Sequence, residues 1–158
     1  MGTLTTLYSF SDAGRGGCPR GGLVKGNDGT LYGTVSIGKN GHGMVFKITS
    51  GGTLTVLHQF SGDEGDFLFD GLVQGSDGCF YGTTASLKTR LGTLFKISST
   101  GALTTLHRFI GGADGSIPQG TLVQGNDGYL YGTADGGTND AGIVFKLFVP
   151  PNSPLKHH

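Results

Sequence analysis

Short apolar runs separated by glycine-rich turns recur along the whole chain. In the first part of the sequence these runs cover residues 23–25, 31–35, 44–48 and 54–60. β-Branched and aromatic residues dominate them, which is typical of strands. No segment combines a helical period of apolar residues with capping residues at its ends. The pattern therefore predicts an all-β chain built from short antiparallel strands.

The same unit occurs three times. GTLTTLYSF at Gly2 recurs as GTLTVLHQF at Gly52 and as GALTTLHRF at Gly101. A fixed period of this length indicates a solenoid, a propeller or an array, and four strands in about 50 residues correspond to one propeller blade. We predict a β-propeller segment over 1–148, with repeats at about 2–51, 52–100 and 101–148. A proline-rich tail follows at 149–158, and its last histidines could belong to an expression tag.

An Asp-Gly pair lies between the first two apolar runs of each unit. It occurs as Asn27-Asp28-Gly29, and again around Asp77 and Asp127. Asp-Gly between two apolar runs predicts a hairpin with a type I′ turn. We therefore interpret the recurring aspartates as turn residues and not as a ring of calcium ligands.

Other side chains recur at the same period. The tyrosine and phenylalanine series are expected to pack between blades, the lysine series to face solvent, and the two histidines to pack on edge strands. These series are Tyr32, Tyr81 and Tyr131; Phe46, Phe95 and Phe145; Lys47, Lys96 and Lys146; His58 and His107.

The motifs GLVQGSDGCFYGTT, GTLFKIS and GALTTLHRF occur together in this order. This trio resembles the Gloeo-Verruco tandem repeat of bacterial proteins, and the resemblance covers residues 2–148. It implies a β-propeller of unknown biochemical function and supplies no catalytic residues. The chain departs from that pattern because it has only three units.

Three blades are fewer than the four to eight of typical propellers. The sequence opens with the equivalent of a fourth strand, at 4–10, and closes with the equivalents of the first three, at 121–147. We predict that Leu4–Phe10 completes the last blade of a partner copy, and favour a homodimer of six blades over a homotrimer of nine. A fragment or evolutionary model of a longer propeller, with no ligand of its own, is the alternative. The predicted interface residues are Leu4, Thr6, Tyr8, Phe10, Val144, Phe145 and Leu147.

One set of connections between strands is nearly identical in all units, while the other set diverges. The diverging set covers residues 11–20, 36–42, 61–70, 85–91, 110–120 and 134–141, and we call it the loop face. Loops on a rigid scaffold often carry function, although unconstrained drift would also make them diverge. Phe67 is expected to pack between blades, and Phe69 to be an exposed contact. The candidate ligand-binding residues are Arg15, Arg20, Lys39, His42, Asp63, Glu64, Asp66, Phe69, Lys88, Arg90, Asp114, Asp135 and Asp140.

Composition narrows the classes of function. Glycine contributes 32 of 158 residues, charged residues are 14%, and the formal net charge is zero. This balance argues against a nucleic-acid partner, because affinity for phosphates comes mainly from Lys and Arg. No apolar run predicts a membrane partner, and no leader predicts a compartment. The two cysteines, Cys18 and Cys79, are too few for a disulfide framework.

No motif for a nucleophile elbow, a phosphate-binding loop or a HExxH zinc site is present. We expect no catalytic residue, no metal and no cofactor. The predicted function is a self-assembling scaffold or binding module with a glycan or protein ligand at the loop face. The alternative is a hydrolase or lyase that uses acidic residues and a divalent ion such as calcium, with oxygen ligands from 63–66 or 135–140.

Overall fold

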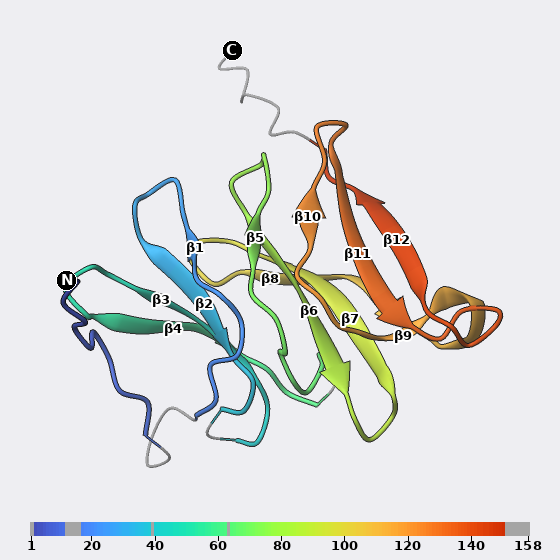
Figure 1. Cartoon of the computed structure of the whole chain (residues 1–158), viewed down its shortest axis with the longest axis horizontal. Coiled ribbons are helices and arrows are strands. Elements are labelled where there is room, and N and C mark those ends of the chain that lie inside the picture. Colours follow the sequence, from blue (N-terminus) through green and yellow to red (C-terminus); the bar gives the residue numbers. More distant parts are fainter. Residues whose placement is uncertain (1, 12–16, 39, 63, 151–158) are drawn as a thin grey trace.

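The apolar runs form strands where the pattern predicts them. The computed structural model describes residues 2–11, 17–38, 40–62 and 64–150, and these form three four-stranded antiparallel sheets (Figure 1). The first two sheets follow chain order, each strand pairing with the next. The first sheet contains β1 (Val24–Lys25), β2 (Leu31–Val35), β3 (Met44–Ile48) and β4 (Leu54–Gln59). The second contains β5 (Val73–Gln74), β6 (Phe80–Ser86), β7 (Leu91–Ile97) and β8 (Leu103–Phe109).

The third sheet is assembled differently. Its main path is β10 (Val123–Gln124), β11 (Tyr129–Asp135) and β12 (Ile143–Phe148). Its fourth strand is β9 (Ser116–Pro118), which precedes the others in the chain, follows the short 3-10 turn η1 (Gly112–Asp114) and pairs with β11. In the part of the chain that the structure describes, no strand pairs with the outer edge of β12.

The Asp-Gly hairpins, which join β1 to β2, β5 to β6 and β10 to β11, are not type I′ turns. Gly29 N donates to Gly26 O at 2.9 Å, and Gly26 N donates to Thr30 O at 2.8 Å. Positive φ occurs at Gly29 (+77°) but not at Asn27 or Asp28, whereas a type I′ turn needs it at both central residues. The hairpin instead has a three-residue loop whose last residue is a left-handed glycine, so the aspartate avoids that strained region.

The sheets pack face to face in chain order, and we call each packed layer between two sheets a seam. In the first seam, Tyr32 stacks on Phe80 with ring centroids 4.0 Å apart, and Phe60 meets Phe95 edge-on at 5.1 Å. In the second seam, Phe109 meets Phe145 at 5.3 Å. The arrangement resembles neighbouring blades, but the three sheets of one chain do not close into a ring (Figure 1).

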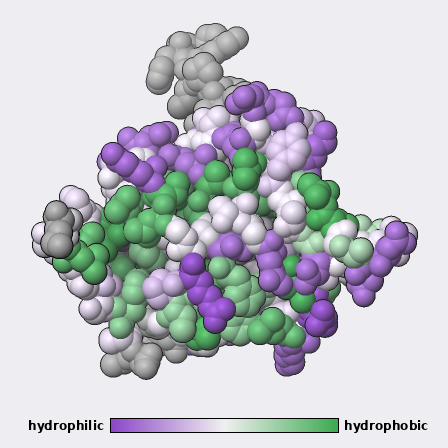
Figure 2. Space-filling model, viewed as in Figure 1, coloured by the Kyte–Doolittle hydropathy of each residue, from purple (hydrophilic) through white to green (hydrophobic). Residues whose placement is uncertain are grey.

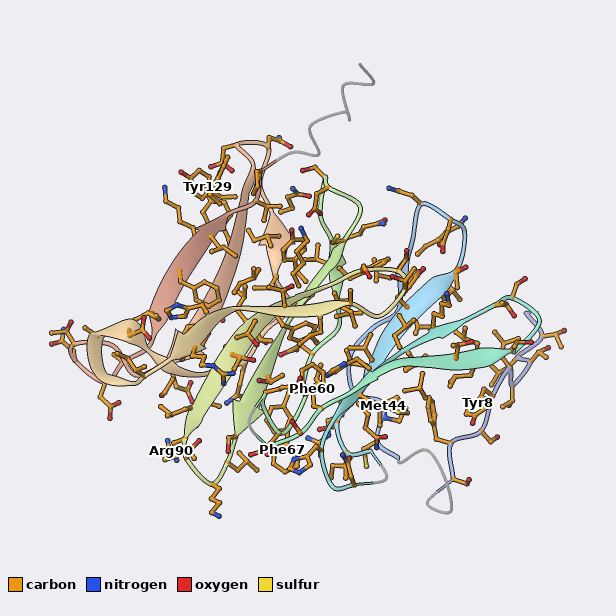
Figure 3. The ribbon with its side chains drawn as sticks, turned by 180° about the vertical axis from the view of Figure 1, so that it is seen from behind. Tyr8, Met44, Phe60, Phe67, Arg90 and Tyr129 are labelled. Atoms are coloured by element: carbon orange, nitrogen blue, oxygen red, sulfur yellow. The ribbon has the colours of Figure 1, made fainter. Side chains whose placement is uncertain are left out.

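The strand predicted over 4–10 does not form in the single chain. Residues 2–11, which we call the N-terminal segment, form no strand. They run beside the first sheet, where Figure 3 shows Tyr8. There Phe10 meets Phe46 edge-on at 5.4 Å, and Tyr8 packs against Phe10. The place of a fourth strand is already filled in the first and second sheets, by β4 and β8.

Candidate functional site

The turn at the end opposite the loop face is held by a tyrosine–aspartate bond in every sheet. Asp28 Oδ1 accepts from Thr30 N at 3.0 Å, and Asp28 Oδ2 accepts from the Tyr32 hydroxyl at 2.7 Å. Burial, followed by this carboxylate, raises the pKa of Tyr32 to about 12, so the phenol stays a donor. The same bond joins Asp77 to Tyr81 at 2.8 Å and recurs in the third sheet. The interpretation of the aspartates as turn residues is confirmed, and the tyrosines have a polar role besides packing.

The second sheet adds an ion pair with a buried carboxylate to this arrangement. Lys96 Nζ lies 2.6 Å from Asp77 Oδ2, and the Asp77 side chain is only 3% exposed. Burial raises the pKa of Asp77, but the bonds from Lys96 and Tyr81 outweigh it and hold that pKa below its usual value. The lysine series was predicted to face solvent; the Lys96 side chain is 35% exposed, but its ammonium is bound to Asp77. This charge pair is therefore part of the framework and is not a free site for a ligand.

On the loop face, the structure brings together residues from neighbouring repeats. His42 Nδ1 lies 2.9 Å from Asp66 Oδ1, which joins a loop of the first repeat to a loop of the second. The guanidinium of Arg20 lies over the Phe69 ring, 5.7 Å from its centroid. Cation–π and charge-assisted contacts of this kind stabilise loops and can also receive polar ligands.

The hydrophobic plug beneath this face is Leu68 and not Phe67. Leu68 is fully buried in the first seam, where its side chain meets Gly43. Phe67 is half-buried and stacks on Phe69 at 5.9 Å. The prediction that Phe67 packs between blades is therefore wrong, because its backbone pairs with Ala85 and directs the next residue inward. Phe67 and Phe69 together form an aromatic pair at the edge of the loop face.

Two acidic candidates hold their own loops in place. Glu64 Oε2 lies 3.1 Å from His58 Nε2, and Asp114 Oδ1 lies 3.0 Å from His107 Nε2. Each histidine also packs edge-on against the phenylalanine two residues later in the chain. The sequence predicted that these histidines pack on edge strands, but their acidic partners were missed. The available signal was an acidic residue that follows the phenylalanine shortly afterwards in both repeats.

The remaining candidates stay separate from these groups. Lys88 and Arg90 are exposed at the β6–β7 hairpin, and Asp135 and Asp140 are exposed on the third sheet. Figure 3 places Arg90 and Phe67 at one end of the molecule and Tyr129 at the other. Within the described ranges, no three His, Cys, Asp or Glu side chains gather closely enough to hold a metal ion. Arg15, Lys39 and Asp63 lie outside the described residues.

The outward faces of the first and third sheets expose side chains that are buried in the seams. Val45 and Leu94 are 0% and 1% exposed, whereas Val144, at the same place in the third repeat, is 78% exposed. Leu72 and Leu122 are buried, whereas their equivalent Leu23 is 55% exposed. Figure 2 shows apolar surface at the left, over the first sheet and the N-terminal segment, and again over β12.

A model of the Gloeobacter/Verrucomicrobia repeat matches residues 1–153. The chain belongs to the Gloeobacter/Verrucomicrobia repeat family. A search of curated proteins found no match. No helix in the part that the structure describes is long and apolar enough to span a membrane.

The geometry gives a physical reason for the most regular motif of this Gloeobacter/Verrucomicrobia repeat chain. In each Tyr-Gly-Thr, the tyrosine donates to the turn aspartate. Tyr32 and Tyr81 also pack in the two seams, as predicted, whereas Tyr131 lies half-buried on the outward face of the third sheet. A Cβ at Gly33 or Gly82 would lie 2.7 Å from a phenylalanine ring atom of the neighbouring strand, so only glycine fits. The repeat motif therefore encodes the seams, and the ligand-binding candidates lie outside it.

Proposed function

We propose that this chain is a non-enzymatic β-repeat scaffold that associates with further copies of itself and presents its loop face to a ligand. Two copies would give a closed propeller of six blades, and three copies one of nine. The proposal rests on one observation: equivalent apolar positions are buried in the two seams and exposed on the two outward faces. Proteins that stay monomeric rarely leave large contiguous apolar faces in water.

The two outward faces are chemically suited to each other. The outward face of the third sheet carries Tyr131 and Val144, whose equivalents Tyr32 and Val45 fill the first seam. The outward face of the first sheet carries Phe46 and Ile48, which the N-terminal segment covers in the single chain. Their equivalents in the second sheet, Phe95 and Ile97, pack with Tyr32 and Val45 in the first seam. A third seam between two copies would therefore repeat contacts that the chain already makes twice.

Ligand binding is proposed at the loop face because its loops differ between repeats while the sheets beneath them do not. The half-buried aromatic pair of Phe67 and Phe69, with Arg20 over one ring, lies beside the His42–Asp66 pair. Aromatic rings next to hydrogen-bonding groups suit the faces and hydroxyls of a glycan, or a polar protein surface.

Light scattering after size exclusion tests the association. A particle of twice or three times 16.3 kDa supports the proposal, and a 16.3 kDa particle at all micromolar concentrations contradicts it. Val144→Lys should shift the mass toward that of one chain, because a charge would enter the seam. Leu87→Lys is the matched control, since Leu87 is 60% exposed but lies on the hairpin at the loop face.

A glycan array with the 158-residue protein tests the ligand. Binding that is lost in Phe69→Ala and kept in Leu87→Lys would place the site at the Phe67 and Phe69 pair, away from the β6–β7 hairpin of the same face. Binding that is unaffected by Phe69→Ala and by Arg20→Ala would place the ligand elsewhere.

A further inference from the structure

The N-terminal segment occupies the position of a fourth strand that belongs to a preceding sheet. In both seams, a phenylalanine at the end of the fourth strand meets the third-strand phenylalanine of the next sheet: Phe60 meets Phe95 at 5.1 Å and 61°. Phe10 meets Phe46 in the same way, at 5.4 Å and 66°. The segment thus packs on the first sheet as a strand of a sheet before it would.

The backbone shows the same equivalence independently. A Cβ at Gly101 would lie 2.5 Å from the carbonyl oxygen of Leu57, where the fourth strand of the first sheet crosses the second sheet. A Cβ at Gly52 would lie 2.5 Å from the carbonyl oxygen of Leu7. Residues 7–10 therefore lie against the first sheet as residues 57–60 lie against the second.

In the third sheet, no described strand fills the place beside β12 that corresponds to the fourth strand of the second sheet. In the second sheet, β7 pairs with the fourth strand at Lys96↔Thr104, Leu94↔His107 and Gly92↔Phe109. The equivalent residues of β12 have no such neighbour among the described strands. An open edge of this kind exposes backbone donors and acceptors that readily pair with another strand.

We infer that the N-terminal segment of one copy is the fourth strand of the third sheet of another copy, in the register of the second sheet. This inference rests on the proposed self-association and specifies its contact. The register places Thr5 opposite Lys146, Tyr8 opposite Val144, and Phe10 opposite Gly142. The segment would hold its own first sheet with Phe10 and the other copy's β12 with its backbone.

Two apolar cavities in the single chain match the side chains that this pairing brings. One, of about 310 Å³, lies between the N-terminal segment and the first sheet and is lined by Leu7, Phe10, Leu23, Phe46 and Ile48 among others. In the first seam, the equivalent positions pack around Tyr32 and Val45. Their counterparts in the third sheet, Tyr131 and Val144, would enter the cavity from the other copy.

The second cavity, of about 240 Å³, lies beside β12 and is lined by Phe109, Ile143, Phe145 and Leu147 among others. Leu103 packs on the corresponding cluster of the first seam. Its equivalent in the N-terminal segment is Leu4, which is 97% exposed in the single chain. The pairing would bury Leu4 of one copy against the second seam of the other.

Site-directed cross-linking tests the register. Thr5→Cys and Lys146→Cys are introduced together with Cys18→Ser and Cys79→Ser, and the protein is oxidised or treated with a short bis-maleimide. Residues directly opposite in an antiparallel pair have Cβ atoms about 4.5–5.5 Å apart. We expect covalent oligomers that end at the size of the ring, whether dimer or trimer. The matched control is Thr5→Cys with Lys47→Cys, because the edge of β3 at Lys47 is already occupied by Thr55.

The outcomes separate the inference from the proposed function. An oligomer in light scattering that gives no cross-link at Thr5 and Lys146, or an equal cross-link at Lys47, would overturn the register but leave self-association standing. A protein with the mass of one chain would overturn both. Deletion of residues 1–10 gives a second test that needs no new cysteine: the oligomer should dissociate, and an unchanged mass would overturn the strand exchange.

Discussion

The first seam and the outward face of the third sheet contain equivalent residues of the repeat, but these residues are buried in the seam and exposed on the outward face. Val45 is inaccessible because the second sheet covers it, whereas Val144 is 78% exposed because no sheet lies beyond it. The corresponding tyrosines differ in the same direction, since Tyr32 is fully buried and Tyr131 only half-buried. Burial in this chain is therefore set by the neighbouring sheet and not by the residue type, so equivalent substitutions should have unequal effects.

The largest difference in the free energy of unfolding is expected between Leu94→Ala and Val144→Ala. Leu94 is 1% exposed in the second seam, and its truncation should lower the free energy of unfolding by about 2–5 kcal/mol. Val144→Ala should have little effect on the dilute chain because water already covers that position. Chemical denaturation at low protein concentration measures both.

Raising the protein concentration sharpens this comparison. If another copy covers Val144, the loss caused by Val144→Ala should grow with concentration, while that of Leu94→Ala stays large throughout. Equal losses for both variants in the dilute chain would show that the third sheet is already covered within one molecule.

Asp77→Asn is expected to have the next largest effect. It removes the acceptor of Lys96 and Tyr81 in a nearly buried site, so we expect a loss of about 1–3 kcal/mol at neutral pH. Asp127→Asn, its equivalent on the exposed third sheet, should lower the thermal midpoint less. A larger shift for Asp127→Asn would contradict the difference in burial.

The same aspartate predicts a pH dependence. Because the pKa of Asp77 is lowered in the folded state, the unfolded chain binds more protons in acid, and stability rises with pH in that window. The contribution is complete above the ordinary aspartate pKa of about 4 and is lost as pH falls through the folded value. Thermal melts between neutral and acid pH should therefore show a shallower acid decline in Asp77→Asn than in the unmodified protein.

A smaller difference in stability is expected between Gly101→Ala and Gly52→Ala. A fourth strand passes over Gly101, and the N-terminal segment passes over Gly52. Gly101 and Gly52 have φ of +96° and +87°, so Ala strains both, by about 1 kcal/mol each. Each new Cβ also meets a carbonyl oxygen, from Leu57 or from Leu7. If the N-terminal segment is held only when a second copy pairs with it, Gly52→Ala should be the milder variant in dilute solution and approach Gly101→Ala on association. Thermal midpoints across a concentration series measure this.

The smallest expected effect concerns the loop face. Arg20→Ala removes a cation–π contact with Phe69 at an exposed site, which should change stability by less than about 1 kcal/mol. Unchanged thermal melting with weakened glycan binding would separate recognition from folding at this face.

Local pattern was sufficient to predict most strands. The run predicted over 31–35 is β2, and that over 44–48 is β3, since alternation and β-branched residues determine strands locally. The turn type was wrong because Asp-Gly is compatible with more than one loop length, and hydrogen bonding to Tyr32 favours the longer loop. The strand predicted over 4–10 does not form in the single chain. A strand needs the edge of another strand to pair with, and a local sequence pattern does not supply that edge.

The candidate site was less predictable than the sheets. The pairs Arg20–Phe69 and His42–Asp66 each join two different repeats, so their contact depends on the angle between sheets. The histidine–acid pairs occur within one repeat and were missed because the loop length before the acid differs between Glu64 and Asp114.

Gly21 and Gly71 bring the backbones of the first and second sheets into contact, since a Cβ at Gly71 would lie 2.8 Å from the carbonyl oxygen of Gly22. This contact fixes how sharply one wedge-shaped sheet turns from the next. Head-to-tail contacts end in a finite particle only if the summed rotation returns to its start, and otherwise they continue as an open fibre. In the proposed ring, a side chain at Gly21 would change this rotation and favour an open polymer over a closed particle.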